Sequence, residues 1–238
     1  EVDAVLSIAS GADEFEGVKE YDDLTKFIIG DTKEDWINVE EGKKEMSEEL
    51  DITPTKRDDV AFLPYTSGTT GNPKGVVYHH RGAAINAVSN ILEWDMPKHP
   101  VYLWTLPMFH CNGWCFPWSI SVAVGTHVCL RQVRAKLMYD AIATHKVTHL
   151  CGAPIVMATL LATPAADKRA LPHQVQFVVA GAPPPEAVLA AMKEAGFAVC
   201  HVYGLTEVYG PAVVNEWHSE WNAKPAPEQA ALMARQGV

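Results

Sequence analysis

Residues 176–204 read QFVVAGAPPPEAVLAAMKEAGFAVCHVYG, and the pattern in this stretch decides the fold. The first apolar run, QFVVA, is typical of a buried strand and ends at Gly181. Prolines then open a helical pattern over 185–195, where a missing backbone N–H costs nothing, and Gly196 closes that helix. A second apolar run follows at 197–203. Strand, helix and strand in this order predict a parallel βαβ unit.

The same alternation extends along the rest of the chain. Runs rich in β-branched residues predict further strands at 4–8, 26–30, 60–64, 101–107, 127–130 and 148–152. Patterns with helical spacing lie near 82–93, 114–123, 134–145, 154–163 and 227–235. Strands that alternate with helices are typical of parallel architecture, so the predicted fold class is α/β, with parallel β-sheets flanked by helices.

The composition is that of a globular protein with unevenly distributed charge. The 238 residues are 48% hydrophobic and 20% charged, and the net charge is −10. Residues 1–60 hold 19 acidic and 7 basic side chains, against 10 and 12 in residues 61–238. A nucleic-acid groove needs a concentrated basic surface, so we expect no nucleic-acid partner. The polar run at 39–59 predicts a solvated loop or a weak helix.

Neither a membrane span nor a disulfide framework is expected. The best apolar candidate, SISVAVGTHVCL, is interrupted by Gly125 and His127 and falls short of the roughly 18 residues that a spanning helix needs. The five cysteines stand at 111, 115, 129, 151 and 200, an odd number without a C-x-x-C pair. These features favour reduced thiols in an intracellular compartment, and we expect a cytoplasmic protein, with the peroxisomal matrix as the alternative.

A loop rich in glycine and hydroxyl side chains follows the predicted strand at 60–64. Residues 65–75 read YTSGTTGNPKG and offer closely spaced backbone N–H groups and hydroxyls to an anion, while Lys74 adds a mobile positive charge. A plain turn is the alternative, because glycine, serine, threonine and proline also cluster in turns. The Walker A loop is excluded, since Gly75 follows the lysine where that loop needs a hydroxyl.

Three motifs, in this order, resemble those of the AMP-forming acyl-activating superfamily, which includes acyl-CoA synthetases, 4-coumarate–CoA ligases, firefly luciferase and peptide-synthetase adenylation domains. The stretch TSGTTGNPKG (66–75) resembles the phosphate loop of this superfamily. GAPPP (181–185) resembles its adenine-side motif, and YGLTE (203–207) resembles its Y-G-x-T-E motif. The resemblance covers 61–238. Two stretches, LPMFHCNGW and the terminal EWHSEWNAKPAPEQAALMARQGV, resemble short- and medium-chain fatty-acyl-CoA synthetases and plant acyl-activating enzymes. The stretch RDDVAFLPYTSGTTG is more similar to the coumarate-ligase branch.

The resemblance implies part of the N-terminal domain of the acyl-CoA synthetase/luciferase fold and a two-step reaction. ATP and a short- or medium-chain carboxylic acid would give acyl-AMP and pyrophosphate, and coenzyme A would then displace AMP to form the thioester. The implied cofactors are ATP, Mg²⁺ and coenzyme A, and the implied partner is the small carboxylic acid. No general base is needed, because the acid is already ionised at neutral pH and is its own nucleophile.

The motifs also imply a role for each matching residue. The nucleotide-binding set is Thr66, Ser67, Gly68, Thr69, Thr70, Gly71, Lys74, Gly181, Ala182, Pro183, Tyr203, Gly204, Leu205 and Thr206. The catalytic set is Thr206, Glu207, Lys74 and His110. Lys74 would steady the leaving pyrophosphate, and Tyr203 would stack on adenine. Thr206 would bind the α-phosphate and Glu207 would hold Mg²⁺. The alternatives are a core tyrosine at 203 and a helix-end carboxylate at 207.

His110 and two tryptophans are candidates for the acyl side of the site. His110 could be a buried side chain or a general base, while the resemblance implies a gate beside the carboxylate and pantetheine tunnel. Trp114 and Trp118 are four apart on a predicted helix, so they share a face and could line an acyl pocket or belong to the core. The substrate-binding set is His110, Trp114 and Gly181. His79, His80 and Arg81 are interpreted as helix-entry residues.

The domain organisation implied by the resemblance is incomplete. Residues 1–60 would be an acidic, partial N-terminal segment with a polar loop, and residues 61–238 the AMP-binding core. The ribose-binding aspartate, the hinge and the small C-terminal domain with its lysine do not follow MARQGV, so we expect an inactive fragment of the large N-terminal domain. A 4-coumarate–CoA ligase-like or other adenylate-forming enzyme, a non-catalytic nucleotide-binding fragment and a phosphotransferase that forms ADP are the open alternatives. The oligomeric state stays open.

Overall fold

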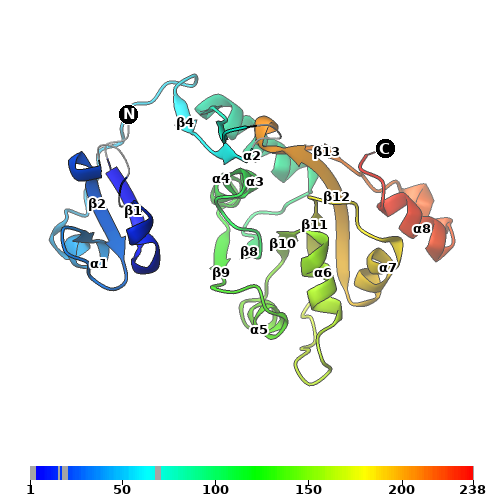
Figure 1. Ribbon diagram of the computed structural model, residues 1–238. Helices are drawn as coiled ribbons and strands as arrows, with labels where there is room; N and C mark the ends of the chain where they lie inside the picture. The colour runs from blue at the N-terminus through cyan, green and yellow to red at the C-terminus, as the bar shows by residue number, and fades with distance from the viewer. Residues whose placement is uncertain (1–3, 16, 18–20, 68–70, 238) are drawn as a thin grey trace. The chain divides into compact units, whose positions relative to one another are not determined.

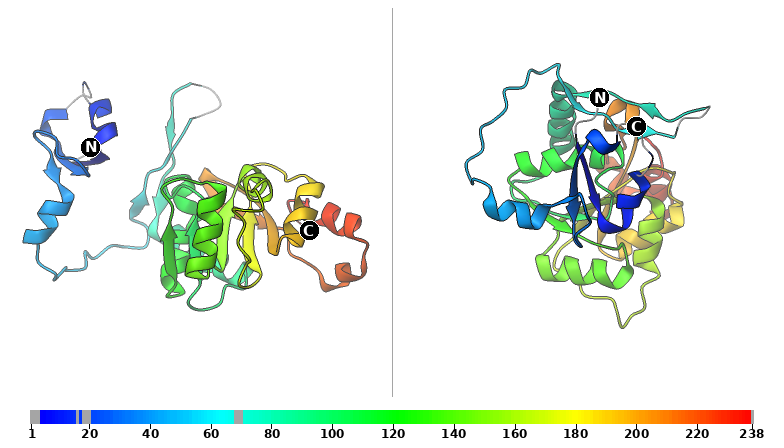
Figure 2. Two further views of the ribbon diagram at one scale, coloured as in Figure 1. Left: turned by 90° about the horizontal axis from the view of Figure 1, so that it is seen from below. Right: turned by 60° about the vertical axis from the view of Figure 1, so that its left-hand side comes forward.

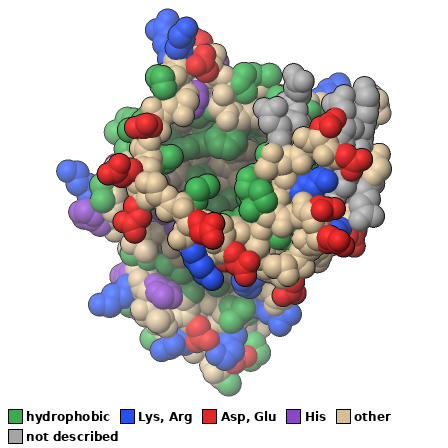
Figure 3. All heavy atoms as spheres, turned by 90° about the vertical axis from the view of Figure 1, so that its left-hand side faces the viewer, with side chains coloured by type: hydrophobic (Ala, Val, Ile, Leu, Met, Phe, Trp, Pro, Cys, Tyr) green, Lys and Arg blue, Asp and Glu red, His purple; other side chains and the backbone are tan. Residues whose placement is uncertain are grey.

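The computed structural model describes residues 4–15, 17, 21–67 and 71–237 (Figure 1). The chain divides into two compact units, Glu1–Pro54 and Thr55–Val238. In the part of the chain that the structure describes, no helix combines the length and the apolar character that crossing a membrane requires. On the face drawn in Figure 3, acidic and basic side chains are interspersed, with hydrophobic side chains among them.

The first unit is built on a three-stranded parallel sheet. Its strands, in the order β1-β2-β3, are β1 (Ala4–Ile8), β2 (Thr25–Ile29) and β3 (Ile37–Asn38). The small core contains Ala12, Ile28 and Trp36. α1 (Val39–Gly42) begins where the Asn38 side chain accepts two backbone N–H groups, and one 3₁₀ turn (Lys43–Glu45) follows it. Residues 46–56 then run without helix or strand.

The second unit is built on a six-stranded sheet with the order β13-β12-β11-β10-β8-β9. The parallel strands are β8 (Val101–Trp104), β9 (Thr126–Cys129), β10 (His149–Gly152), β11 (Val175–Val179) and β12 (Phe197–Leu205). β13 (Gly210–Val214) pairs antiparallel with β12. The prediction of an α/β fold with parallel strands flanked by helices is confirmed.

Helices cover both faces of this sheet (Figures 1 and 2). On one face lie α5 (Ala135–His145), α6 (Pro154–Leu161) and α7 (Glu186–Glu194), with α8 (Ala226–Met233) packed on α7. On the other face lie α2 (His80–Glu93) and α4 (Phe116–Val122). Successive strand residues point to opposite faces: Phe177 belongs to the first core and Val178 to the second. Burial on both sides explains why the strands read as continuous apolar runs.

Of the strands in two short antiparallel pairs before α2, only the one at 60–64 was predicted. β4 (Val60–Phe62) pairs with β7 (Tyr78–His79), and β5 (Tyr65–Thr66) pairs with β6 (Lys74–Gly75). Two or three residues are too few to show an alternating pattern. β13 was also missed, because its Gly-Pro start is typical of a turn.

The predicted helix at 114–123 is wrong at its start. Residues 111–115, which include the short element α3 (Cys111–Trp114), have φ angles between 46° and 63° and form a left-handed turn. The regular helix α4 begins only after Cys115. Trp114 and Trp118 therefore lie on different segments and do not share a helix face. Contacts with residues distant in sequence hold this turn, and helical spacing cannot reveal them.

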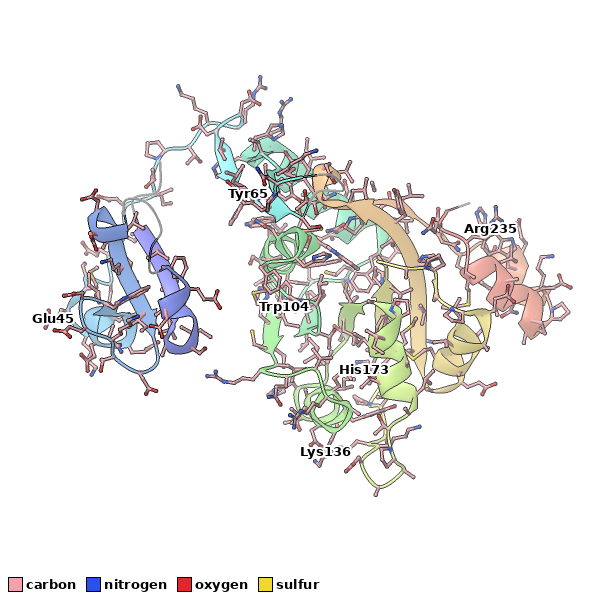
Figure 4. The ribbon with its side chains drawn as sticks, viewed as in Figure 1. Glu45, Tyr65, Trp104, Lys136, His173 and Arg235 are labelled. Carbon is pink, nitrogen blue, oxygen red and sulfur yellow. The ribbon has the colours of Figure 1, made fainter. Side chains whose placement is uncertain are left out.

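Burial in the sheet lowers the pKa of His149. His149 is 3% exposed, its ring lies edge-on to Trp94, and its Nδ1 lies 2.7 Å from Thr148 Oγ1. Burial is the main cause, and His173, labelled in Figure 4, adds to it, so the pKa falls from 6.5 to about 4. His149 is therefore neutral in the folded protein at neutral pH.

The free energy of unfolding should fall by about 2 kcal/mol between pH 7.5 and pH 5 because of His149. A histidine whose pKa is lower in the folded than in the unfolded state binds more protons when unfolded, so acidification favours unfolding. The loss should begin near the unfolded value of 6.5 and level off near pH 4. Urea titrations of the wild type and of His149→Phe measure it. The same pH dependence in both proteins would contradict this assignment.

Candidate functional site

The predicted phosphate loop lies at the end of a β-hairpin. Thr66 on β5 pairs with Lys74 on β6, so the residues that flank the loop lie side by side. Ser67, Gly71 and Lys74 are exposed, and Gly71 has φ of +90°, a conformation that favours glycine. Gly68, Thr69 and Thr70 lie outside the described residues. The described part thus exposes Ser67 and Lys74 on opposite sides of the hairpin.

A buried tyrosine connects the strand after this loop with the YGLTE motif. Tyr78 on β7 is 0% exposed, and its hydroxyl donates to the backbone carbonyl of Thr206 at an O···O distance of 2.6 Å. Its ring stacks on Tyr209 at a centroid distance of 4.1 Å. Burial raises the pKa of Tyr78 above its ordinary value, so the phenol keeps its proton and acts as a donor.

Tyr209 lies against the first turn of α2. Its hydroxyl accepts the backbone N–H of His79 at 3.2 Å and lies 3.1 Å from His79 Nδ1. The same Nδ1 accepts the N–H of Gly82 at 2.8 Å and caps α2, so the interpretation of His79 as a helix-entry residue is confirmed. Gly82 leaves room for the tyrosine, because a Cβ there would lie 2.4 Å from Tyr209 Cζ.

The YGLTE motif occupies the end of β12 and the 3₁₀ turn that follows it, Thr206–Val208. Tyr203 is 43% exposed, which excludes a core tyrosine and leaves its ring free for stacking. Gly204 lies at a β-bulge, where a Cβ would come within 1.7 Å of the Gly210 carbonyl oxygen, so only glycine fits. Leu205 and Glu207 are exposed, and the carboxylate of Glu207 lies in the first turn of the 3₁₀ segment.

The left-handed turn at 111–115 packs against this motif. Cys111 Sγ lies 3.1 Å from Thr206 Oγ1, and the Cys115 thiol donates to the Tyr209 carbonyl at 3.4 Å. Left-handed backbone costs roughly 1–2 kcal/mol for each residue with a side chain, and such contacts offset the strain. Burial raises the pKa of Cys115 to about 12 and also raises the pKa of Cys111, so both are neutral thiols.

A small cavity of about 50 Å³ lies between this turn and the carboxyl end of the sheet. Its lining consists of His110, Cys111, Trp114, Ala180, Gly181, Val202, Gly204, Gly210 and Pro211. The three residues predicted to bind substrate are thus brought together. His110 is exposed, which excludes a buried histidine, whereas Trp114 is 6% exposed and also packs in the core.

Trp118 does not line this cavity. Its ring packs on Phe62 at a centroid distance of 5.1 Å, and both border an open depression of about 620 Å³ that Met108 and Phe109 also line. The prediction that Trp114 and Trp118 line one pocket is therefore wrong. Ala182 and Pro183 are exposed just beyond Gly181, which has φ of +87°.

Glu207 is the carboxylate predicted to bind a metal ion at this site. Among the described residues, no three His, Cys, Asp or Glu side chains come together in a way that could hold a metal ion. One exposed carboxylate fits Mg²⁺ that is shared with phosphate oxygens and water, the usual arrangement at nucleotide sites.

The five cysteines are free, as predicted. The side-chain amide of Asn90 donates to the Trp114 carbonyl at 2.8 Å and so also holds the turn at 111–115. Tyr78, Tyr209 and Asn90 were missed as site-forming residues, because nothing in their sequence spacing marks them.

A family model described as AMP-binding enzyme matches residues 2–235. The chain belongs to the AMP-binding enzyme family. The acetate/butyrate–CoA ligase AAE7, peroxisomal, of Arabidopsis thaliana is 58% identical over 177 residues, which make up 74% of this chain and 31% of that protein. The chain spans about a third of the length of the curated relatives that it matches first.

Solved structures of other proteins share the fold. The inhibitor-bound N-terminal domain of FACL13 from Mycobacterium tuberculosis has a TM-score of 0.73 and 25% identity, and the match covers 88% of this chain and 52% of that chain. The O-succinylbenzoate coenzyme A synthetase MenE of Bacillus subtilis, in complex with ATP and magnesium, has a TM-score of 0.70 and 27% identity over 94% of this chain and 43% of that chain. The superfamily resemblance and the N-terminal-domain fold are confirmed.

In this AMP-binding enzyme, Gly82→Ala should lower the free energy of unfolding by about 1–3 kcal/mol, because the new Cβ meets the Tyr209 ring. Urea titrations of Gly82→Ala, Tyr209→Ala and the double variant test this as a cycle. The cost of the Gly82 change should shrink when the tyrosine ring is absent. An equal cost in both backgrounds would show that the ring does not restrict position 82.

Proposed function

We propose that this chain forms the nucleotide and acyl site of an AMP-forming carboxylate–CoA ligase for short- or medium-chain acids. The observation that carries the proposal is the small cavity lined by His110, Trp114 and Gly181, which shares Cys111 with the contact to Thr206. This cavity supports an apolar acyl site beside the residue expected to bind the α-phosphate. The name of the relative AAE7, an acetate/butyrate–CoA ligase, supports the short end of the range.

In the first step, the substrate carboxylate oxygen bonds to the α-phosphorus of ATP and the bond to pyrophosphate breaks. Thr66, Ser67 and Gly71 would hold the β- and γ-phosphates together with Gly68, Thr69 and Thr70. Lys74 would offset the charge that grows on pyrophosphate. The exposed Tyr203 ring would stack on adenine, Gly181, Ala182, Pro183, Gly204 and Leu205 would shape the wall around it, and the Thr206 hydroxyl would bind the α-phosphate.

In the second step, the sulfur of coenzyme A bonds to the acyl carbon, AMP leaves and the thiol proton passes to solvent. The exposed His110 would act as the gate between the acyl cavity and the pantetheine path. Glu207 would hold Mg²⁺, which would neutralise phosphate oxygens when bound.

We further propose that the protein is located in the peroxisomal matrix and not in the cytoplasm, because the relative AAE7 is named peroxisomal. Co-localisation with a peroxisomal marker checks this assignment.

Acid-dependent ATP–pyrophosphate exchange by the full-length protein tests the proposal, and Glu207→Gln should lower the exchange rate about 100-fold. The change keeps the shape of the side chain but removes the charge that would hold Mg²⁺. Glu194→Gln, which alters an exposed carboxylate at the end of α7, is the matched control and should keep the rate. An unchanged rate in Glu207→Gln would refute the metal assignment. Release of ADP in place of AMP would favour the phosphotransferase alternative.

The optimum acid length should move toward longer acids in Trp114→Gly. An apolar cavity gains about 0.8 kcal/mol, or roughly fourfold in affinity, for each further methylene that it buries. Glycine also accepts the φ of 56° at this position. A series from acetate to decanoate measures the optimum, with Trp118→Gly as the control, since Trp118 borders the other depression. An optimum that stays in place would contradict the acyl role of Trp114, and hydroxycinnamates outrunning every aliphatic acid would favour the coumarate-ligase alternative.

A further inference from the structure

One buried hydroxyl joins two segments that the proposed reaction must keep in register. Tyr78 follows Lys74 by four residues and lies on β7, the strand that leads from the phosphate loop into α2. Its hydroxyl donates to the Thr206 carbonyl at 2.6 Å, although the two residues are 128 positions apart. The bond therefore crosses from the phosphate-loop side of the site to the YGLTE side.

Thr206 is held at both its main chain and its side chain. Its carbonyl also accepts the N–H of Tyr209 at 3.1 Å, which closes the 3₁₀ turn that carries Glu207. Its Oγ1 lies 3.1 Å from Cys111 Sγ. Of these three contacts, only that of Tyr78 comes from the strand after the phosphate loop. It is thus the contact that ties the Thr206 main chain directly to that strand.

The Tyr78 ring has little freedom to move. It is 0% exposed and stacks on Tyr209 at 4.1 Å with an interplanar angle of 30°. Tyr209 is in turn held by the backbone N–H of His79, the residue next to Tyr78. A phenylalanine at position 78 would keep this stack and lose only the hydrogen bond, so the two contributions can be separated by experiment.

We propose that Tyr78 is a positioning residue of the adenylation step, whose hydroxyl holds Thr206 and Glu207 in place relative to Lys74. The inference rests on the proposed function, in which Thr206 and Glu207 act on the α-phosphate and the metal. Tyr78 acts through the backbone of Thr206 and does not touch the substrate. Without its hydroxyl, the 3₁₀ turn keeps its own hydrogen bond and the contacts of Tyr209 with β7, but the Thr206 carbonyl loses its direct bond to the strand after the phosphate loop.

The test compares Tyr78→Phe with Tyr102→Phe in the full-length protein by acid-dependent ATP–pyrophosphate exchange. Tyr102 is also 0% exposed, but it lies in the sheet core, where its hydroxyl is near Cys151. We expect Tyr78→Phe to lower kcat about 10-fold and to raise the half-saturating Mg²⁺ concentration about fivefold, with KM for ATP within about twofold. Tyr102→Phe should stay within about twofold of the wild type in all three quantities.

Incorporation of 4-aminophenylalanine at position 78 provides the rescue, because it returns an N–H donor to the same ring. It should restore kcat to within about threefold of the wild type. A lower Tm and kcat with an unchanged Mg²⁺ dependence would reveal a merely structural role and overturn the proposal. Equal behaviour of the two phenylalanine variants, or a Tyr78→Phe protein that does not fold, would overturn it as well. A wild type without exchange would instead refute the proposed function, and this inference would fall with it.

Discussion

The parallel sheet of the second unit must bury both of its faces, and the arrangement of the rest of the unit follows from this constraint. Parallel strands need a crossover between them, so α5, α6 and α7 return the chain across one face, while α2 and α4 close the other. The connections that leave the carboxyl ends of the strands then meet at one edge. There Gly181 after β11 and Gly204 of the YGLTE motif at the end of β12 line one cavity together with residues of the turn at 111–115. The site is a consequence of how the sheet is covered.

The sequence predicts the repeating part of this structure well. Residues 176–204 show why: FVVA at 177–180 is apolar at every position, and proline and glycine mark the two ends of the helix that follows. The motifs also lead to the correct family. The hairpins around the phosphate loop could not be predicted, because two-residue strands such as Lys74–Gly75 carry no periodicity. The helix expected from Trp114 onward failed because contacts from Asn90 and Tyr209 hold a backbone conformation that the local sequence disfavours.

The candidate site combines exposed chemistry with buried support. Lys74, His110, Tyr203 and Glu207 are open to solvent, where they can meet a charged nucleotide. The groups that hold their segments are almost fully removed from water: Tyr78 is 0% exposed, Cys115 is 0% exposed and Asn90 is 8% exposed. Motif reading found the first set, since ligand chemistry restricts residue type and spacing. It missed the second set, because a supporting hydrogen bond can come from any donor that the fold brings near.

The left-handed turn at 111–115 bears on the order in which the molecule assembles. Its bonds reach back to Asn90 and forward to Thr206 and Tyr209, so the turn cannot persist until α2 and the end of β12 have docked. Until then, chirality favours the right-handed form of the same residues. On heating, loss of these partners would let the turn relax while the strands stay paired, and the cavity would disappear before the sheet melts. The small cavity beside this turn therefore depends on contacts that are remote in sequence, and we expect its local stability to lie below that of the sheet.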